Sequence, residues 1–424
     1  MNLNLLNKQK NKYRFGILIR YYRHINQYSL RSLASLVGIS HAYLSQIEIG
    51  KATISKRTFD YLISALDIKP HYDSEAEKQF YAVFDKVINN LFYFNLKQLN
   101  ETISTQKKLK KHHEYTLWEF DYQLMMLFYH SMQPKIDLLT LNKSYHQLVQ
   151  VESLLYDYQK IILKISYANI KYHAYDIDSV IETLEKALEL KPKDNYIALI
   201  YYLLGLAYGE IYKLMRSNHY LDLAIEHFKR QNNDLRLKFT YIFKTFNYVK
   251  IGNRHMIEQS LNEALTFSQY YNLKQLEALA FKHFVIYYLK MDKTREAIRF
   301  LDYWQGESYE YCFFDILVRL KHKANQKQLL KRLKEHEKKR MLQTPKQLIY
   351  VYGLAFLKSH IAQPPKQQEQ HLKAFFCETI KAKKYFEVSV AYDYYQAFLV
   401  RQRRYKDALE ITEKIIDISK KAYD

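Results

Sequence analysis

The sequence predicts an all-α protein, with a small helical bundle at its N-terminus followed by a long array of helical hairpins. Three observations lead to this fold class. Glycine and proline, which interrupt helices, occur only 8 and 6 times in 424 residues, while 48% of the residues are apolar. Residues 29–50 read as two short helices joined by a tight turn. Beyond residue 70, apolar and aromatic residues recur with a period of 40.

The two short helices carry start and stop signals. Ser29 and Ser40 stand at N-cap positions, where a hydroxyl oxygen accepts a hydrogen bond from an N–H of the first turn. Gly38 occupies the turn, where a positive φ favours glycine, and Gly50 closes the second helix. A third helix is expected just before, over residues 15–25. The faces that bury against one another are predicted to hold Ile17, Leu18, Tyr21, Leu33, Ala34, Val37, Leu44 and Ile47.

Residues 15–68 resemble the Cro/repressor (XRE-type) helix-turn-helix family. The resemblance implies a domain that places its second short helix in the major groove of DNA. The motifs that carry it stand in register at Ile19, Arg20, Arg23, Ser29, Leu33, Ala34, Gly38 to Ser40, Ile47, Glu48, Gly50, Lys51, Ala65, Leu66 and Ile68.

The resemblance also implies individual site residues. Gln46 matches a base-reading position and can pair with N6 and N7 of an adenine, while Ala42 can touch a thymine methyl. Glu48 matches a position that pairs with Arg23, so it is expected to be structural. Leu30 departs from the family, where a polar phosphate contact is usual. The predicted DNA-binding set is Ser40, His41, Ala42, Tyr43, Ser45, Gln46, Lys51, Lys56 and Arg57.

Positive charge is concentrated in two segments. Residues 1–70 contain 11 Lys and Arg against 3 Asp and Glu, a net charge of +8, which suits attraction to DNA phosphates. Residues 321–340 contain 9 basic and 2 acidic residues, a net charge of +7. This second segment is either a solvated helix face or a further contact for an anion or DNA.

The 40-residue period predicts stacked helical hairpins. It relates Tyr201 to Tyr241 and Phe281, and residues 216–218, 252–253 and 292–293 carry turn signals. One hairpin cannot bury its apolar face alone, so such repeats stack into an α-solenoid. The other residues in the period are Ile181, Leu184, Tyr208, Leu221, Ala224, Tyr248, Leu261, Ala264, Tyr288, Leu301 and Trp304, and Tyr208, Tyr248 and Tyr288 are expected to be buried.

The internal spacing resembles tetratricopeptide (TPR) repeats. Tyr201, Leu204, Gly205, Tyr208, Leu221 and Ala224 fall on the W-L-G-Y-F-A positions of that motif. The resemblance implies a concave face lined by the first helix of each pair, where a short extended peptide can bind. The predicted peptide-binding residues are Asn169, Tyr202, Glu210, Phe246, Lys250, Lys282 and Lys290.

We therefore expect three segments: a DNA-binding domain over 1–70, a linker over 71–75 and a TPR-like domain over 76–424 for ligand binding and dimerisation. Pro70 is expected to stop the last helix of the first domain, and Ser74 to cap the next helix.

The sequence lacks the usual signs of chemistry or export. Cys312 and Cys377 give neither a disulfide framework nor metal-ligand spacing, and no phosphate-binding or nucleophile motif occurs. No signal peptide is recognised, and the longest apolar run falls short of the ~20 residues that span a bilayer. We expect a cytoplasmic protein with no cofactor, no metal and no enzymatic activity.

Together the two regions resemble the Rgg/PlcR/PrgX (RRNPP) group of peptide-responsive regulators from Gram-positive bacteria. The resemblance implies a transcription regulator acting in quorum sensing, in which a short pheromone peptide binds the repeats and changes a homodimer on two DNA half-sites. Two alternatives stay open: a repeat domain that binds a protein partner, and a phage-type peptide-communication regulator. A solenoid that regulates an enzyme, such as an aspartyl-phosphate phosphatase, fits less well because a DNA reader occupies the N-terminus.

Overall fold

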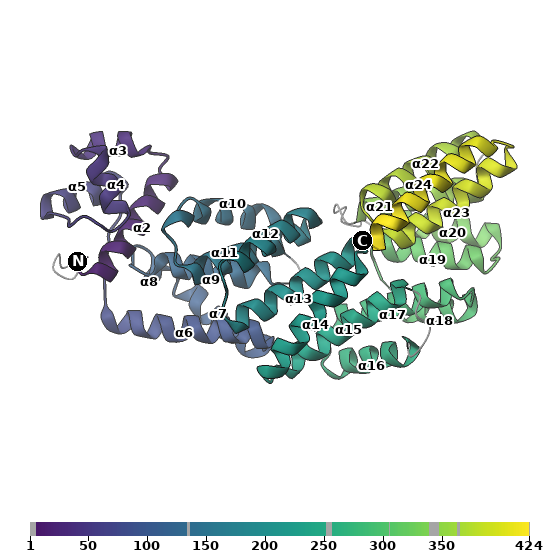
Figure 1. The fold of residues 1–424 in the computed structure, drawn as a ribbon, viewed down its shortest axis with the longest axis horizontal. Helices are drawn as coiled ribbons and strands as arrows, with labels where there is room; N and C mark the ends of the chain where they lie inside the picture. Colours follow the sequence, from purple (N-terminus) through teal and green to yellow (C-terminus); the bar gives the residue numbers. More distant parts are fainter. Residues whose placement is uncertain are drawn as a thin grey trace. The chain divides into compact units, whose positions relative to one another are not determined.

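The computed structural model describes residues 6–133, 136–251, 257–304, 306–338, 347–362 and 365–423. Within these ranges the regular structure is helical, apart from an isolated bridge between His71 and Thr116, which confirms the all-α prediction (Figure 1). The chain divides into two compact units, Met1–Ile200 and Tyr201–Asp424, and each is described by itself. None of the described helices combines the length and apolar character needed to cross a membrane.

The first unit starts with a four-helix bundle, which we call the head. Its helices are α2 (Gln9–Ile25), α3 (Leu30–Val37), α4 (His41–Glu48) and α5 (Lys56–Leu66). The other helices of the unit are α6 (Ser74–Tyr93), α7 (Leu96–Lys108), α8 (Lys110–His113), α9 (Glu119–Ser131), α10 (Leu138–Val149), η1 (Glu152–Leu154), α11 (Asp157–His173) and α12 (Ile177–Glu189).

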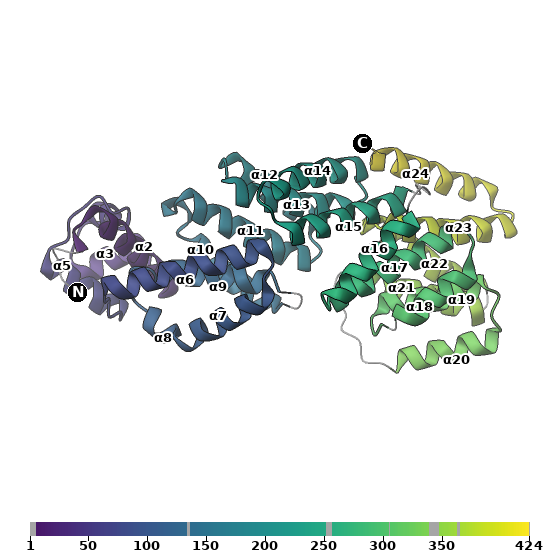
Figure 2. The same ribbon diagram turned by 90° about the horizontal axis from the view of Figure 1, so that it is seen from below.

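The second unit consists of helical hairpins. Helix α13 (Asp194–Glu210) crosses the division and pairs with α14 (Leu214–Arg230). Figure 2 shows α21, α22, α23 and α24 in chain order, and each contacts the next. The helices after α14 are α15 (Asp234–Ile251), α16 (Ile257–Tyr270), α17 (Lys274–Lys290), α18 (Thr294–Trp304), α19 (Tyr309–Lys321), α20 (Gln326–Glu337), α21 (Leu348–Ala362), α22 (Pro365–Lys381), α23 (Tyr385–Arg401) and α24 (Tyr405–Tyr423).

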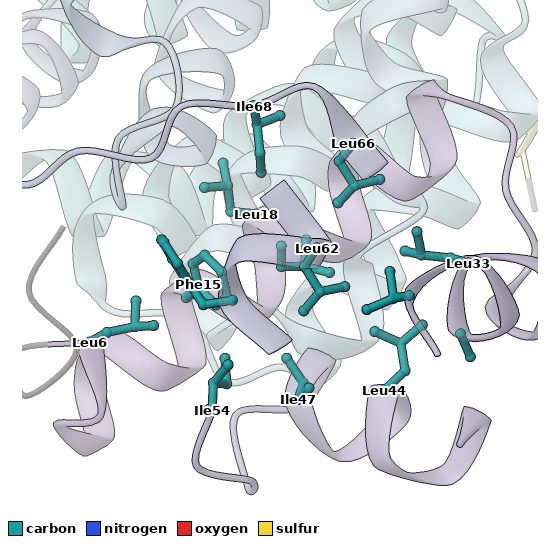
Figure 3. Close-up of a cluster of buried hydrophobic side chains, with 14 of the residues drawn as sticks. Leu6, Phe15, Leu18, Leu33, Leu44, Ile47, Ile54, Leu62, Leu66 and Ile68 are labelled. Carbon is teal, nitrogen blue, oxygen red and sulfur yellow. The ribbon is translucent and has the colours of Figure 1, made fainter. Parts of the chain in front are cut away.

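The head has the core that the sequence predicts. Figure 3 shows Phe15, Leu33, Leu44 and Ile47 converging from α2, α3 and α4. Leu18, Ala34 and Val37 belong to the same cluster. Ile17 and Tyr21 are also buried but lie outside it, and the Tyr21 ring packs on Phe120 of the repeats with ring centres 6.5 Å apart. Leu117, which precedes α9, packs into the same cluster. The first repeats therefore contribute directly to the hydrophobic core of the head.

The predicted caps are confirmed. Ser29 Oγ accepts from the Ser32 N–H at 3.0 Å, and Ser40 Oγ accepts from the Tyr43 N–H at 3.1 Å. Gly38 and Gly50 have φ of 70° and 71°, in the left-handed region that glycine adopts without strain. These residues therefore set the ends of α3 and α4 as the sequence indicates.

Three predicted boundaries around the head are wrong. Helix α2 begins at Gln9, well before residue 15. Helix α5 ends at Leu66, because Asp67 takes a left-handed conformation (φ 50°) before Pro70 can act. Asp73, and not Ser74, caps α6, since its carboxylate accepts from the N–H groups of Glu75 (2.8 Å) and Ala76 (3.2 Å).

The 40-residue period is confirmed by the starts of α13, α15 and α17 at residues 194, 234 and 274. Gly205 lies against Leu221, as the TPR spacing implies, because an added Cβ would approach the Leu221 side chain to 2.6 Å. Tyr208 and Tyr288 are buried as expected, whereas Tyr248 is only half-buried.

The turns between repeat helices follow one geometry. Residues such as Tyr212, Asn232, Asn272 and Asp292 take positive φ two positions after a helix ends, and the next helix starts two positions later. The turn predicted at 292–293 is therefore confirmed. The turn predicted at 216–218 is wrong, since these residues lie inside α14, and the one at 252–253 lies outside the described residues.

Gly16 allows α2 to cross closely over the end of α4. A Cβ at this position would lie 2.3 Å from the Glu48 carbonyl oxygen and 2.6 Å from that of Ile47. Both are backbone atoms of a packed helix, so they cannot move aside without shifting α4 as a whole. At Gly38, by contrast, nothing lies within 4 Å of such a Cβ.

We predict that Gly16→Ala destabilises the head by about 3 kcal/mol, through overpacking against backbone atoms. Gly38→Ala is the control and should cost only about 1 kcal/mol, because it meets a conformational penalty alone. Hydrogen exchange of the α2–α4 amides in the full-length chain measures both effects as local opening free energies. Equal costs for the two variants would contradict the close contact at Gly16.

Candidate DNA-binding surface and repeat-face cluster

The outward face of α4 presents the residues predicted to read bases. His41, Ala42 and Gln46 are exposed, and Ser45 is half-buried beside them. Tyr43 is also half-buried, and its hydroxyl donates to the Thr53 carbonyl oxygen at 2.8 Å. This bond ties the loop after α4 to the helix, so the geometry of the face is set by the head itself.

Three helix N-termini of the head are free of acidic residues. Helices α3, α4 and α5 are capped by Ser29, Ser40 and Ser55, and none carries Asp or Glu in its first turn. A helix N-terminus has a partial positive charge, and carboxylates are usually favoured there. Helix α6 shows that usual arrangement, with Glu75 and Glu77 in its first turn. The head therefore keeps three helix ends open to external anions such as phosphates.

Basic side chains extend the same surface. Lys56 and Arg57 are exposed at the start of α5, and Lys51 is exposed in the loop after α4. The Arg57 guanidinium lies 5.5 Å from the centre of the Tyr61 ring. Cations at a helix N-terminus are unfavourable in isolation, and a bound phosphate relieves that repulsion.

Two further residues singled out from the sequence, Glu48 and Leu30, stabilise the fold of the head. Glu48 is buried and accepts from Arg23, with distances of 2.6 Å (Nε to Oε1) and 3.1 Å (Nη2 to Oε2), so its predicted pairing is confirmed. Leu30 is half-buried and packs on the head core. Its departure from the family pattern thus adds apolar contact at the start of α3.

Arg14 joins the head to the first repeats. Its guanidinium forms an ion pair with Glu77 of α6 and donates to the Tyr81 hydroxyl at 2.6 Å. Tyr81 donates in turn to Asp121 of α9 at 2.5 Å, and Gln159 of α11 donates to the same carboxylate at 2.6 Å. Four helices thus share one network of buried or half-buried polar groups.

The pKa shifts in this network follow from burial and partners. Burial raises the pKa of Asp121, although hydrogen bonds from Tyr81 and Gln159 oppose the shift. Burial also raises the pKa of Glu77, but hydrogen bonds from Tyr72 and Arg14 outweigh it and leave that pKa below its ordinary value.

Glu119 forms a second link between the head and the repeats. Its carboxylate accepts from the Tyr22 hydroxyl of α2 at 2.8 Å and from the Tyr115 N–H at 2.6 Å. Burial raises the pKa of Glu119 to about 7 despite these hydrogen bonds. Glu119 and Asp121 therefore hold the head in place, and the sequence pattern did not reveal this role.

Three of the predicted peptide-binding residues, Tyr202, Phe246 and Asn169, are buried in packing contacts with other side chains of the repeats. Tyr202 is buried with its ring 5.5 Å from the Arg236 guanidinium, and Phe246 stacks on His283 with ring centres 3.9 Å apart. Asn169, in the first unit, is buried and contacts Met132 Sδ at 2.9 Å. These three side chains therefore pack elements of the repeats against one another.

Lys250 and Lys290 repeat one contact at a spacing of 40. Lys250 Nζ donates to the Gly209 carbonyl oxygen at 2.7 Å, and Lys290 Nζ donates to the Lys250 carbonyl oxygen at 2.7 Å. Each lysine thus binds a C-terminal carbonyl of the first helix in the preceding hairpin, where a cation is favoured. Burial lowers the pKa of Lys250 to about 7, and the charges of Lys384 and Lys282 act in the same direction against that of Glu210.

The remaining predicted residues belong to a charged cluster, which we call the repeat-face cluster. Lys282 forms an ion pair with Glu310 at 2.8 Å, and Tyr350 donates to Glu310 and Glu387 at 2.6 and 2.7 Å. Each member lies on or beside the first helix of a hairpin. The cluster consists of Glu210, Lys250, Lys282, Glu310, Tyr350, Lys384 and Glu387.

The same cluster joins the first and last hairpins of the second unit. Lys384 forms an ion pair with Glu210, and the Tyr212 hydroxyl accepts from the Phe386 N–H at 3.2 Å. Sequence reasoning missed Glu310, Tyr350, Lys384 and Glu387. After residue 305 the hairpins depart from the 40-residue spacing, so position in a repeat could not locate them.

A separate groove of about 1240 Å³ lies between α15 and α16. Its lining is rich in aromatic rings, and three of them, Tyr241, Tyr270 and Tyr271, are exposed. Lys238 lies over the Phe267 ring at 5.6 Å. The other aromatic residue of the lining is Tyr248.

The sequence of the head matches a known family model, described as helix-turn-helix, over residues 19–72. Residues 19–72 form a helix-turn-helix domain. This match covers α3, α4 and α5 together with the residues that join them. No curated protein matches the chain in sequence.

Solved structures share the fold of this chain over most of its length. A complex of NprR with its cognate peptide NprX matches with a TM-score of 0.64 and 16% identity, covering 80% of this chain and 98% of that one. Apo NprR from B. thuringiensis matches with a TM-score of 0.57 and 15% identity, covering 81% and 99%. A Rap protein complexed with competence and sporulation factor matches with a TM-score of 0.62 and 11% identity, covering 81% of this chain and 99% of that one.

These likenesses confirm the predicted architecture, a helix-turn-helix head followed by a TPR-like solenoid. The resemblance to the RRNPP group, first based on short motifs, is thereby confirmed at the level of fold. The roles of the individual DNA-binding and peptide-binding residues stay predictions.

The two carboxylates that link the head to the repeats give opposite pH dependences. Glu119 has a raised pKa in the fold, so its contribution to stability is greatest below about 4.5 and is lost as the pH rises to about 7. Relative to Glu119→Gln, the native chain should lose about 2–3 kcal/mol over that range. Glu77 has a lowered pKa, so its contribution is lost as the pH falls.

Hydrogen exchange of the α2 and α9 amides measures both differences, each against its Gln variant: the Glu119 difference between pH 4.5 and 7, and the Glu77 difference below its ordinary pKa of 4.5. The Glu77→Gln comparison serves as the control of opposite sign. A Glu119 difference that does not change with pH would show that this carboxylate is ionised throughout.

Proposed function

We propose that the chain is a DNA-binding transcription regulator controlled by a short signalling peptide, as in quorum sensing. The observation that carries the proposal is the exposed face of α4, together with the serine-capped N-termini of α3, α4 and α5 and the exposed basic side chains of Lys51, Lys56 and Arg57. Such a surface fits base edges in a major groove and phosphates on either side. The proposal assigns the chain no enzymatic reaction and no cofactor.

The proposed peptide site is the repeat-face cluster of the second unit. NprR and Rap structures of similar fold contain a bound peptide or factor, which supports a ligand for these repeats. Among the described residues no carboxylate lies within ion-pair distance of Lys250; its ammonium donates to the Gly209 carbonyl oxygen and lies 5.1 Å from the centre of the Tyr212 ring. A peptide carboxylate would supply the anionic partner, and it would compete with the ion pair between Lys384 and Glu210.

We further propose a homodimer that acts in the cytoplasm. One head covers little DNA surface, so useful affinity requires two heads on two half-sites. In this scheme residues 1–70 read DNA, 71–75 connect, and 76–424 bind the ligand and dimerise. Peptide binding would favour one arrangement of the repeats and thereby change the separation of the heads.

One observation favours the alternative that the repeats bind a protein. The aromatic groove between α15 and α16 is large and partly exposed, as docking grooves for partner segments often are. Its residues differ from those of the repeat-face cluster, so the two sites can be tested separately.

We predict that Gln46→Ala and Lys51→Ala weaken DNA binding in different ways. Gln46→Ala should cost about 1–3 kcal/mol at one base pair of each half-site and relax the sequence preference there. Lys51→Ala should weaken binding to all sequences alike and lower the salt slope by about 1. Footprinting on the upstream DNA of the gene, followed by anisotropy titrations, measures both. Unchanged sequence preference in Gln46→Ala removes that residue from the base-reading set.

We predict that Lys250→Met lowers peptide affinity at least about tenfold, because it removes the cation that faces the peptide carboxylate. Native affinity should fall as the pH rises above about 7, since Lys250 then loses its proton, whereas the variant should show no such change. Calorimetry with synthetic peptides encoded beside the gene measures both effects. Lys229→Met, at an exposed lysine, is the matched control.

Tyr241→Ala combined with Tyr270→Ala tests the groove between α15 and α16 in the same assay. If this pair abolishes peptide binding while Lys250→Met does not change it, the peptide binds the groove, and the repeat-face assignment is wrong.

A further inference from the structure

Helix α20 carries a row of exposed lysines along one face. Lys327, Lys331 and Lys334 lie within the helix, and Lys338 caps its end. Their spacing of three and four residues keeps them within about 60° of the helix circumference and spreads them over about 16 Å. We call these four residues the lysine face.

The opposite side of α20 is fixed in the fold. Leu329 and Leu333 are 2% and 3% exposed. Arg332 and His336 lie 3.3 and 2.8 Å from the buried carboxylate of Asp315. These contacts hold the helix by its apolar side, so the lysine face points outward. Figure 2 shows α20 at the outer edge of the second unit.

No carboxylate of the described residues lies within ion-pair distance of Lys327, Lys331 or Lys334. Of the two acidic residues on α20, Glu337 pairs with Lys358 at 2.6 Å. Glu335 is exposed and lies beside the lysine face. The three lysines within the helix therefore have no ion-pair partner among the described residues, and they outnumber the one exposed carboxylate of α20 that lies beside them. Such a row of like charges attracts polyanions.

We propose that the lysine face binds the phosphate backbone of duplex DNA. Phosphates on one strand follow each other every 3.4 Å of helix axis, so a face of about 16 Å spans several of them. A membrane surface fits less well, because the leucines that would enter it are buried in the fold.

The inference rests on the proposed DNA-binding function of the head. A second basic face on a chain whose head binds DNA gains effective concentration for any duplex that both faces reach. The contact is independent of sequence, so it adds affinity and salt dependence to binding and leaves base preference unchanged.

The test uses the full-length protein and a labelled duplex of about 40 bp, long enough for contacts beyond one half-site. The variant combines Lys327→Gln, Lys331→Gln and Lys334→Gln. Its matched control combines Lys191→Gln, Lys193→Gln and Lys229→Gln, three exposed lysines at other places in the repeats. A third variant, Lys56→Gln with Arg57→Gln, disables the predicted phosphate contacts of the head.

We expect the lysine-face variant to bind at least about tenfold more weakly at low salt and to lower the slope of log K against log salt by about 2–3, with no change in the control. A slope equal to that of the control overturns the inference and leaves an acidic protein as the partner for this face. If the Lys56 and Arg57 variant binds DNA normally, the proposed function of the head fails instead, so the two failures are distinguishable.

Discussion

Burial of Glu77, Glu119 and Asp121 between α2 and the first repeats is the interaction on which the architecture of the first unit depends. A buried carboxylate is costly unless charge or hydrogen bonds compensate for it. Here Arg14 and Tyr22 of the head supply part of that compensation, so the head cannot move away without leaving carboxylates unpaired. These contacts anchor the head on α6 and α9, so we expect a change in these helices to be carried to the helix-turn-helix domain.

This attachment gives the proposed regulation a physical basis. If the head were joined by a free linker alone, its position would not depend on the conformation of the repeats. A docked head instead follows the orientation of the helices that hold it. The head core even includes Leu117, which precedes α9. Ligand binding needs only to favour one arrangement of the repeats for the position of α4 to change with it.

The charges of the second unit are arranged in two distinct ways. In the repeat-face cluster, on the first helices of the hairpins, lysines lie near the carboxylates of Glu210, Glu310 and Glu387 or donate to carbonyl oxygens. Along the outer face of α20, lysines stand in a row without such partners among the described residues. The repeat-face cluster therefore suits a ligand whose charges replace one partner of an existing ion pair. The lysine face suits a polyanion that approaches from solvent.

The sequence by itself determined the local features of this protein. Serine caps, the glycine turn of the head and the 40-residue repeat depend on short-range rules of hydrogen bonding and helix periodicity, and Ser40, Gly38 and the starts of α13 and α15 confirm them. The pairing of Glu48 with Arg23 followed from a family resemblance. Only the tertiary structure decided that Glu119 holds Tyr22, or that Lys384 reaches Glu210 across 174 positions of the chain. Such pairs join segments far apart in the chain, whereas the 40-residue period relates only neighbouring hairpins and therefore does not predict them.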